Sequence, residues 1–305
     1  MNTWIKSIGL FYVNIFFIIS MSACQTLRNS EDQSNKEADI LNDQKTLVVS
    51  FLNKGLPQMA HKELRPLLHQ YPQDADFKNL MGLTLLALEN PKHAVPFFQQ
   101  SLKIQARASV ALNLSSAYIE AKEYDRAIRL LQNMSKSPSM KEYRYPERIA
   151  HNIALAAERK NDWRTAEKYY VKALADNPQY YLSLMRLGQL YEKTERPKMA
   201  IQRFLTARAA CNLCFDPVNG LVMNYLAMKA PSRAVDTIRV FLQQKALSET
   251  DRERAIKLLS MTEGIAANLP SSNNARTRRK NTEKVPVAGS DISQRQRNKT
   301  SQKKL

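Results

Sequence analysis

The side chains best able to bind a metal ion or act as a nucleophile are few in this 305-residue chain, which contains three cysteines and four histidines. Cys211 and Cys214 form a C-x-x-C pair, but no second such pair and no H-x3-H completes the four ligands of a zinc site. Each histidine is expected at the surface or in a groove of a helix, and the four are His61, His69, His93 and His151. The sequence also lacks the glycine-rich, G-x-S-x-G and H-E-x-x-H motifs of nucleotide-binding and hydrolytic enzymes. We therefore predict no catalytic residue, no metal and no cofactor.

Two interpretations of the C-x-x-C pair remain. A thioredoxin-like redox motif needs a strand before it, whereas the residues before Cys211 have the pattern of a helix. If the chain is exported to an oxidising compartment, two cysteines at this spacing form a local structural disulfide. We predict this disulfide between Cys211 and Cys214, and the alternative is two unpaired thiols.

The first 24 residues have the pattern of an export signal. Lys6 supplies a positive charge, and residues 7–20 form an apolar run that is shorter than the roughly 20 residues needed to span a bilayer. The run ends in Met-Ser-Ala-Cys, which resembles the lipobox of bacterial lipoproteins, with Met21 where leucine is usual. In that class the cysteine is acylated and becomes the new N-terminus. The alternative is an N-terminal anchor helix with a chance cysteine.

The lipobox resemblance implies a signal peptide over 1–23 and a lipid on Cys24. Gln25 follows the cysteine, where retention at the inner membrane would favour aspartate. The resemblance therefore implies an outer-membrane protein, anchored by its lipid and facing the periplasm. Residues 24–40 are polar and lack apolar periodicity, which is typical of a flexible tether.

The elements that follow are predicted to be helices arranged in repeats. Glycine is scarce, and straight-chain helix formers are abundant. Six alanines are each followed four residues later by a large apolar residue, and the alanine spacings are 34, 33, 39, 34 and 34. The six pairs are Ala60/Leu64, Ala94/Phe98, Ala127/Leu131, Ala166/Tyr170, Ala200/Phe204 and Ala234/Ile238.

A 34-residue period is that of the tetratricopeptide repeat, in which each unit is a pair of antiparallel helices. Twelve residues before four of the alanines stands a small residue (Gly82, Ser115, Ala154 and Gly188), placed where the two helices of a unit come closest. The interval of 39 indicates an insertion within 135–148, and residues 249–265 read as an amphipathic capping helix. We predict an all-α, right-handed solenoid of about six helix pairs over 41–265.

The C-terminal segment, 266–305, is predicted to be a disordered basic tail. It contains ten lysine or arginine residues and two acidic residues, in a chain whose formal net charge is +18. Such a tail favours acidic partners. It lacks the interleaved aromatic residues that stack on bases, and export would separate it from most nucleic acid. We expect contact with an anionic envelope polymer and no nucleic acid.

One position of the first helix in each unit suggests a peptide-binding groove. Asn113, Asn152 and Arg186 occupy the sixth position of successive units. They resemble the asparagines and basic residue with which chaperone-binding tetratricopeptide proteins hold the carboxylate of a peptide. The lysines of that clamp are absent, because Leu112 and Leu182 stand in their places. The alternative is a row of solvated polar residues on the concave face.

The chain also resembles the tetratricopeptide lipoproteins of type IV pilus biogenesis, the secretin pilotin or pilus-stability family. Three segments carry the resemblance: LNLSSAYIEAKEYDRAI at 112–128, YRYPERIAHNIA at 143–154 and AEKYYVKALADNP at 166–178. Leu114, Ser116 and Ala154 depart from the family's pattern. The family often has a disulfide between units, whereas the pair in this chain lies elsewhere.

This resemblance implies a non-enzymatic scaffold of about six repeats at the outer membrane. It would bind a protein partner, such as a secretin subunit, and assist assembly of the secretin pore or stability of the pilus. One alternative is another periplasmic scaffold that organises peptidoglycan enzymes or outer-membrane assembly. A further alternative is a binder of anionic polymers that acts through the basic tail.

Overall fold

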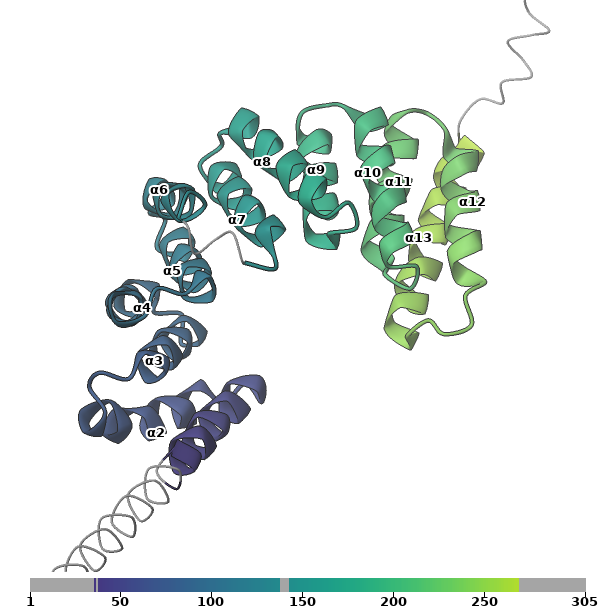
Figure 1. The fold of residues 1–305 in the computed structure, drawn as a ribbon. Helices are drawn as coiled ribbons and strands as arrows, with labels where there is room; N and C mark the ends of the chain where they lie inside the picture. Colours follow the sequence, from purple (N-terminus) through teal and green to yellow (C-terminus); the bar gives the residue numbers. More distant parts are fainter. Residues whose placement is uncertain (1–35, 37, 138–142, 269–305) are drawn as a thin grey trace, which may run out of the picture.

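A computed structural model of the protein describes residues 36, 38–137 and 143–268, and all regular structure in these residues is helical (Figure 1). A helix over 38–53 comes first and pairs with α2 (Pro57–Gln70). Five more pairs follow, and a final helix closes the array: α3 (Ala75–Ala87) with α4 (Pro91–Ile104), α5 (Ala108–Glu120) with α6 (Tyr124–Met134), α7 (Pro146–Arg159) with α8 (Trp163–Asp176), α9 (Tyr181–Lys193) with α10 (Pro197–Ala210), α11 (Phe215–Ala227) with α12 (Pro231–Leu242), and then α13 (Glu249–Asn268). The predicted all-α solenoid of six helix pairs and a capping helix is confirmed.

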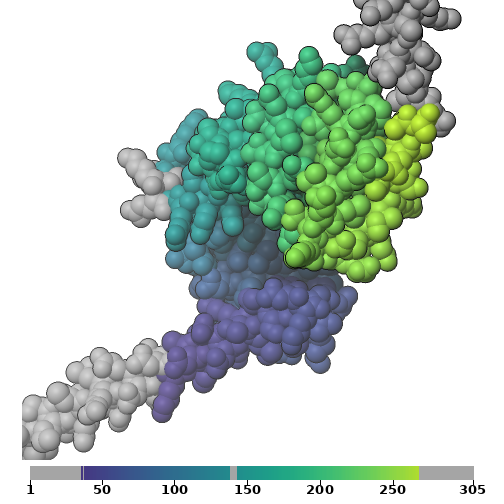
Figure 2. Space-filling view, turned by 90° about the vertical axis from the view of Figure 1, so that its right-hand side faces the viewer, coloured from purple at the N-terminus to yellow at the C-terminus, as the bar shows by residue number. Residues whose placement is uncertain are grey.

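The pairs stack side by side into an arc (Figure 1). We name the first helix of each pair its A helix and the second its B helix. The A helices α3, α5 and α7 lie on the inner side of the arc, and the B helices α4, α6 and α8 lie on its outer side. The space-filling view shows a hollow between the N-terminal and the C-terminal units (Figure 2). A segment bound in this hollow would therefore contact A helices first.

The register of the repeat agrees with the alanine pattern. All six alanines are fully buried in their B helices, and the large residue four positions later is at most 1% exposed in every unit. Since one helical face holds positions i and i+4, both residues of each pair point into the contact with the A helices. The core is consequently a row of similar layers that continues from one unit to the next.

Two glycines show how closely the helices of one unit approach. A Cβ atom built on Gly82 would lie 2.6 Å from Cε1 of Phe98, and one built on Gly188 would lie 2.6 Å from Cε1 of Phe204. Both contacts join an A helix to the B helix of the same unit, as the spacing predicts. The ring of Phe204 also lies against Gly220 of the next A helix, where a Cβ would be 2.7 Å from Cε2. This second contact has no counterpart in the predicted pattern.

The turn from A helix to B helix has the same backbone conformation in all six units. One residue of each turn has a positive φ, between 55° and 69°. Only the first is a glycine, and the six are Gly55, Glu89, Lys122, Asn161, Glu195 and Lys229. A left-handed residue directly after a helix lets the following N–H groups bond back to the last carbonyls, as Asn90 N does to Leu85 O at 2.8 Å. These turns repeat with the spacing of the alanines.

The irregular interval lies between α6 and α7, within the range predicted for the insertion. Residues 135–145 separate these helices, and 138–142 lie outside the described residues. Units three and four still share a core, because Leu112 and Leu131 pack with Ile149 and Ile153 across the interval. The insertion therefore lengthens a connection and does not interrupt the stack.

Both ends of the described array extend slightly beyond the predicted boundaries. Residues 38–40, predicted as part of the tether, already belong to the first helix, and α13 continues to Asn268. The predicted signal peptide, Cys24 and the rest of the basic tail lie outside the described residues. Within the described ranges no helix is long and apolar enough to cross a membrane.

Candidate functional site

Polar pairs link successive A helices along the inner face of the arc. One position contributes to each of the first four links, and its residues are Lys45, Asn79, Asn113, Asn152 and Arg186. They are 34 residues apart, except for the 39 between Asn113 and Asn152. We refer to these pairs together as the inter-repeat ladder.

The first pair of the ladder is ionic. Nζ of Lys45 lies 3.0 Å from Oδ2 of Asp76 in α3, and Asp76 also accepts a hydrogen bond from Arg107. Burial of Asp76 would raise the pKa of its carboxyl, but the hydrogen bonds from Arg107 and Lys45 outweigh burial, so that the pKa is lowered. The carboxylate therefore stays ionised and ties units one, two and three together.

The two predicted asparagines each belong to a different link of the ladder. Nδ2 of Asn113 donates to Oδ1 of Asn79 at 3.0 Å, which joins α5 to α3. Nδ2 of Asn152 donates to Oγ of Ser115 at 3.3 Å, which joins α7 to α5. Both side chains are half-buried and keep a free amide oxygen in the described structure. Their role in peptide binding remains a prediction.

Arg186 takes part in the next link, between α9 and α7. Its Nη1 lies 3.9 Å from Oε1 of Glu158, and Nζ of Lys193 lies 3.6 Å from the same oxygen. Glu158 is buried and also accepts a hydrogen bond of 2.6 Å from the hydroxyl of Tyr170. The structure thus places the three predicted groove residues on one face, at three separate links. It does not bring them together around one ligand position.

His151 is buried, and its expected place at the surface or in a groove is wrong. It is 7% exposed, its Nδ1 lies 2.9 Å from Oγ of Ser183, and its ring packs against Tyr170 and Tyr180. Burial, together with the nearby charge of Arg186, lowers the pKa of His151 to about 4. The side chain is therefore a neutral part of the contact between α7, α8 and α9.

The other three histidines surround one surface groove of about 520 Å³ between α2 and α4. His61 and His69 come from α2 and His93 from α4, where its Nδ1 lies 2.6 Å from Oδ1 of Asn90. No group of three histidine, cysteine or acidic side chains within the described ranges is placed to hold a metal ion.

A larger groove, of about 640 Å³, lies between the A helices α9 and α11. We name it the α9–α11 groove. One wall is formed by Met185, Gln189 and Glu192 of α9, and the other by residues of α11. The remaining lining residues are Glu195, Pro197, Phe204, Asp216, Asn219, Gly220, Met223, Asn224 and Ala227. Gly220 stands at the ladder position of the last unit, and the ring of Phe204 occupies the space that a side chain there would need.

The polar floor of the α9–α11 groove is held by one buried amide. Asn224 is 3% exposed, and its Nδ2 donates to Oε1 of Glu192 at 2.6 Å and to the carbonyl of Gly220 at 2.7 Å. Burial raises the pKa of Glu192, and the hydrogen bond from Asn224 opposes this rise. The carboxylate is thus fixed at the floor without a cation beside it.

The sequence analysis did not identify the α9–α11 groove, although the repeat period contained a signal for it. Met185 and Asn219 are 34 residues apart, as are Gln189 and Met223, so each pair occupies one position in successive units. Residues at one position of adjacent A helices face each other across their junction. What the period could not reveal is which junction is open, because that depends on the Phe204 ring and the two glycines around it.

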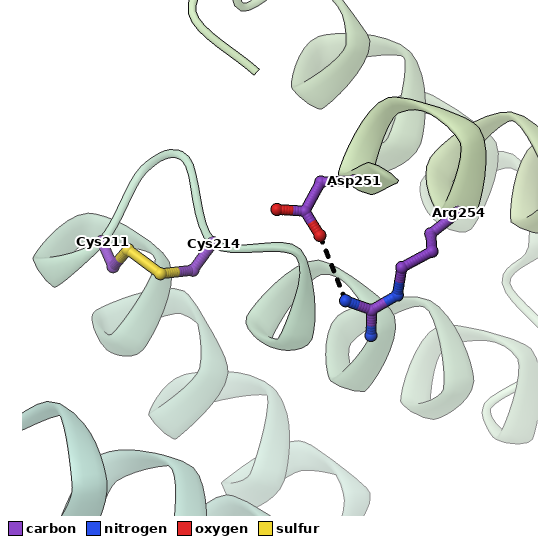
Figure 3. The surroundings of a disulfide bond; sticks show 4 residues. All are labelled: Cys211, Cys214, Asp251 and Arg254. Atoms are coloured by element: carbon purple, nitrogen blue, oxygen red, sulfur yellow. Dashed lines mark hydrogen bonds and ion pairs between the residues drawn. A yellow bond between two sulfur atoms is a disulfide. The ribbon is translucent and has the colours of Figure 1, made fainter. Parts of the chain in front are cut away.

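The structure joins Cys211 and Cys214 by a disulfide in the connection between α10 and α11 (Figure 3). Their Cα atoms are 5.4 Å apart. Arg254 of α13 lies near this connection, bonded to Asp251 at 3.1 Å and to Asp216 of α11 at 3.0 Å. The oxidation state of the pair in the cell remains a prediction.

Comparison with known proteins agrees with the helical repeat. Residues 151–212 match the family model described as tetratricopeptide repeat, a scaffold fold that typically has no enzymatic activity. No curated protein sequence matches the chain.

Three solved structures share the fold at low sequence identity. PilW, described as a widely conserved type IV pilus biogenesis factor, gives a TM-score of 0.58 at 15% identity, covering 70% of this chain and 97% of PilW. PilF of Pseudomonas aeruginosa gives 0.55 at 18% identity, covering 70% of this chain and 95% of PilF. Yeast Tom70 gives 0.55 at 13% identity, covering 73% of this chain and 46% of Tom70. The chain is therefore a tetratricopeptide-type scaffold for protein interaction, similar in fold to the pilus biogenesis factors PilW and PilF.

Proposed function

We propose that the protein is an outer-membrane lipoprotein that binds a protein client on its repeat surface and assists assembly of the type IV pilus secretin. The observation that carries this proposal is the extent of the fold likeness, which spans 97% of PilW and 95% of PilF. The lipobox-like sequence that ends at Cys24 supports a lipid anchor. Attachment of both partners to one membrane raises their effective concentration, so that a moderate affinity is sufficient.

Deletion of the gene in the bacterium that encodes the chain tests the proposed role. We expect secretin subunits to be present without heat-stable multimers, and pili to be lost. A plasmid copy of the wild-type gene should restore both. Normal multimers in the deletion strain would reject the secretin role and favour another periplasmic scaffold, such as one for peptidoglycan enzymes or outer-membrane assembly.

The anchor is tested separately with a Cys24→Ser variant and a fatty-acid probe. The variant should lose the label, leave the membrane fraction and fail to bring the client to the outer membrane. A Cys211→Ser/Cys214→Ser variant is the matched control, because it removes the other two cysteines and should keep the label. Persistent labelling of Cys24→Ser would contradict the anchor and leave the role of the repeats open.

A further inference from the structure

We propose that the α9–α11 groove binds an extended segment of a partner protein in which a lysine or arginine lies beside large apolar side chains. The proposal deepens the proposed function and rests on it only in taking the ligand to be a protein. It concerns the chemistry that this groove selects, whichever assembly the protein serves.

The charge of the groove is opposite to that of the chain. Its lining contains Glu192, Glu195 and Asp216 and no lysine, arginine or histidine, whereas the whole chain has a net charge of +18. A basic segment would approach a surface that repels it nearly everywhere else and would find its complement here. Charge complementarity of this kind selects among partners even where it adds little affinity.

The basic side chains of α9 and the turn after it have partners outside the groove. Arg186 and Lys193 pair with Glu158 of α7, and the Lys193 ammonium also lies 5.3 Å from the ring centre of Trp163. Arg196 makes two hydrogen bonds to the carboxylate of Glu167, at 3.0 and 2.8 Å. These three cations face the preceding unit and do not neutralise the groove.

Two of the three acids are not compensated by a cation. Asp216 is bonded to Arg254 and adds little net charge. Glu192 is held only by the neutral amide of Asn224. Glu195 is exposed in its turn and has no ion-pair partner within the described ranges. A ligand cation near the floor would therefore meet two carboxylates, one of them already oriented and half-buried.

The remaining lining fits a peptide. Met185 and Met223 face each other on the two walls, and Met223 is 48% exposed. Thioether side chains adapt their shape to different apolar groups. Gln189 and Asn219 have no hydrogen-bond partner in the described structure, so each amide can donate to and accept from an extended backbone. Charge, apolar walls and free amides thus point to one kind of occupant.

The basic tail of the chain is the competing occupant. Its main basic run, 276–280, has no large apolar residue within four positions on either side. Such a run matches the carboxylates of the groove but not its methionine walls. We therefore assign the groove to a separate protein, and truncation of the tail provides the test of this choice.

Two capped, fluorescent peptides that differ in one residue test the proposal on the purified protein. One is Ser-Ala-Leu-Lys-Met-Ala-Ser, and the other has glutamate in place of lysine. Fluorescence anisotropy should show roughly tenfold tighter binding of the lysine peptide, because the ligand cation meets two carboxylates. High salt should reduce the preference. Equal affinity for the two peptides would overturn the proposal.

Substitutions locate the binding. Glu192→Gln/Glu195→Gln should bring the two peptides to within about twofold of each other, whereas Glu192→Asp should retain most of the preference. The matched control is Glu89→Gln/Glu120→Gln, where Glu89 holds the same turn position as Glu195 in another unit and both residues are exposed. A preference that survives Glu192→Gln/Glu195→Gln would place the binding elsewhere.

Removal of residues 269–305 should leave the lysine-peptide affinity unchanged. A tenfold gain would mean that the tail occupies the groove and would overturn the assignment to a partner. The deletion strain separates this proposal from the proposed function. Loss of secretin multimers, together with absence of a peptide preference, would reject the groove ligand and retain the assembly role.

Discussion

At the residue scale, His151 shows how the stack controls a titratable group. Its ring is enclosed by Ser183, Tyr170 and Tyr180 and lies near Arg186, so a proton on the imidazole would be poorly solvated and repelled. Since burial and a neighbouring cation act in the same direction, the folded chain binds this proton only near pH 4. The unfolded chain binds it near the model value of 6.5.

Stability should therefore fall as the pH is lowered from about 6.5 to about 4. In this window the unfolded chain binds more protons than the folded chain, so the free energy of unfolding rises with pH, by about 3 kcal/mol in total. His151→Gln should lack this part of the pH dependence. The measurement is urea unfolding at several pH values, with the exposed His69→Gln as control. Parallel pH curves for wild type and His151→Gln would show that His151 is protonated equally in both states.

The candidate site could be predicted only in part at this scale. The repeat position of Asn113, Asn152 and Arg186 placed them on the inner face, but hydrogen bonds to neighbouring A helices separate their roles. Those partners are set by side-chain conformations, which spacing alone does not determine. For His151 the signal was missing, because a lone histidine in a helix gives no indication of what packs over it.

At the scale of elements, the fully buried alanines of the B helices determine how closely a unit packs. Ala166 of α8 and Ala200 of α10 are 0% exposed, and each is followed by a buried aromatic ring in the next turn. A larger side chain at either alanine has no space to enter without moving a neighbouring helix.

Ala166→Leu should lower the free energy of unfolding by roughly 1–3 kcal/mol through overpacking. Ala175→Leu is the matched control, since Ala175 is exposed on the same helix and its change should stay within about 0.5 kcal/mol. The same comparison can be made in α10 with Ala200→Leu and Ala209→Leu. Chemical denaturation followed by circular dichroism provides the values. Equal losses at buried and exposed alanines would mean that the repeat register is wrong.

Most of the fold could be predicted at this scale because one pattern recurs six times. Small and large residues at fixed spacing determine which helical faces meet, and the spacing of 39 located the only long connection between pairs in the described array. The second contact of Phe204, with Gly220, could not be predicted. It depends on how one unit sits on the next, which the pattern within a unit does not define.

At the scale of the whole molecule, the fold and the basic tail are expected to act independently. Each unit contacts its neighbours, and α13 covers the last pair by packing Ala255 and Leu258 against Ile238 and Phe241. The stack is therefore closed before the tail begins. Stability in such an array is a sum over units and their interfaces.

Removal of residues 276–305 should leave the helical content and the unfolding midpoint unchanged. It should also weaken binding to vesicles that contain phosphatidylglycerol, because most of the basic residues of the tail are lost. Co-sedimentation at low and high salt measures this effect, and the difference between full-length and truncated chains should vanish at high salt. Unfolding at a lower denaturant concentration after truncation would contradict the independence of the tail.

The six left-handed turns constrain how this protein could change in length during evolution. Each turn fixes the step from an A helix to its B helix, and even a single added residue there would rotate the B helix and move its alanine out of the contact. The only irregular interval lies instead in a connection from a B helix to the next A helix. Natural variants of this architecture should therefore gain or lose either whole 34-residue units or residues between units. An insertion between an A helix and its own B helix should be selected against.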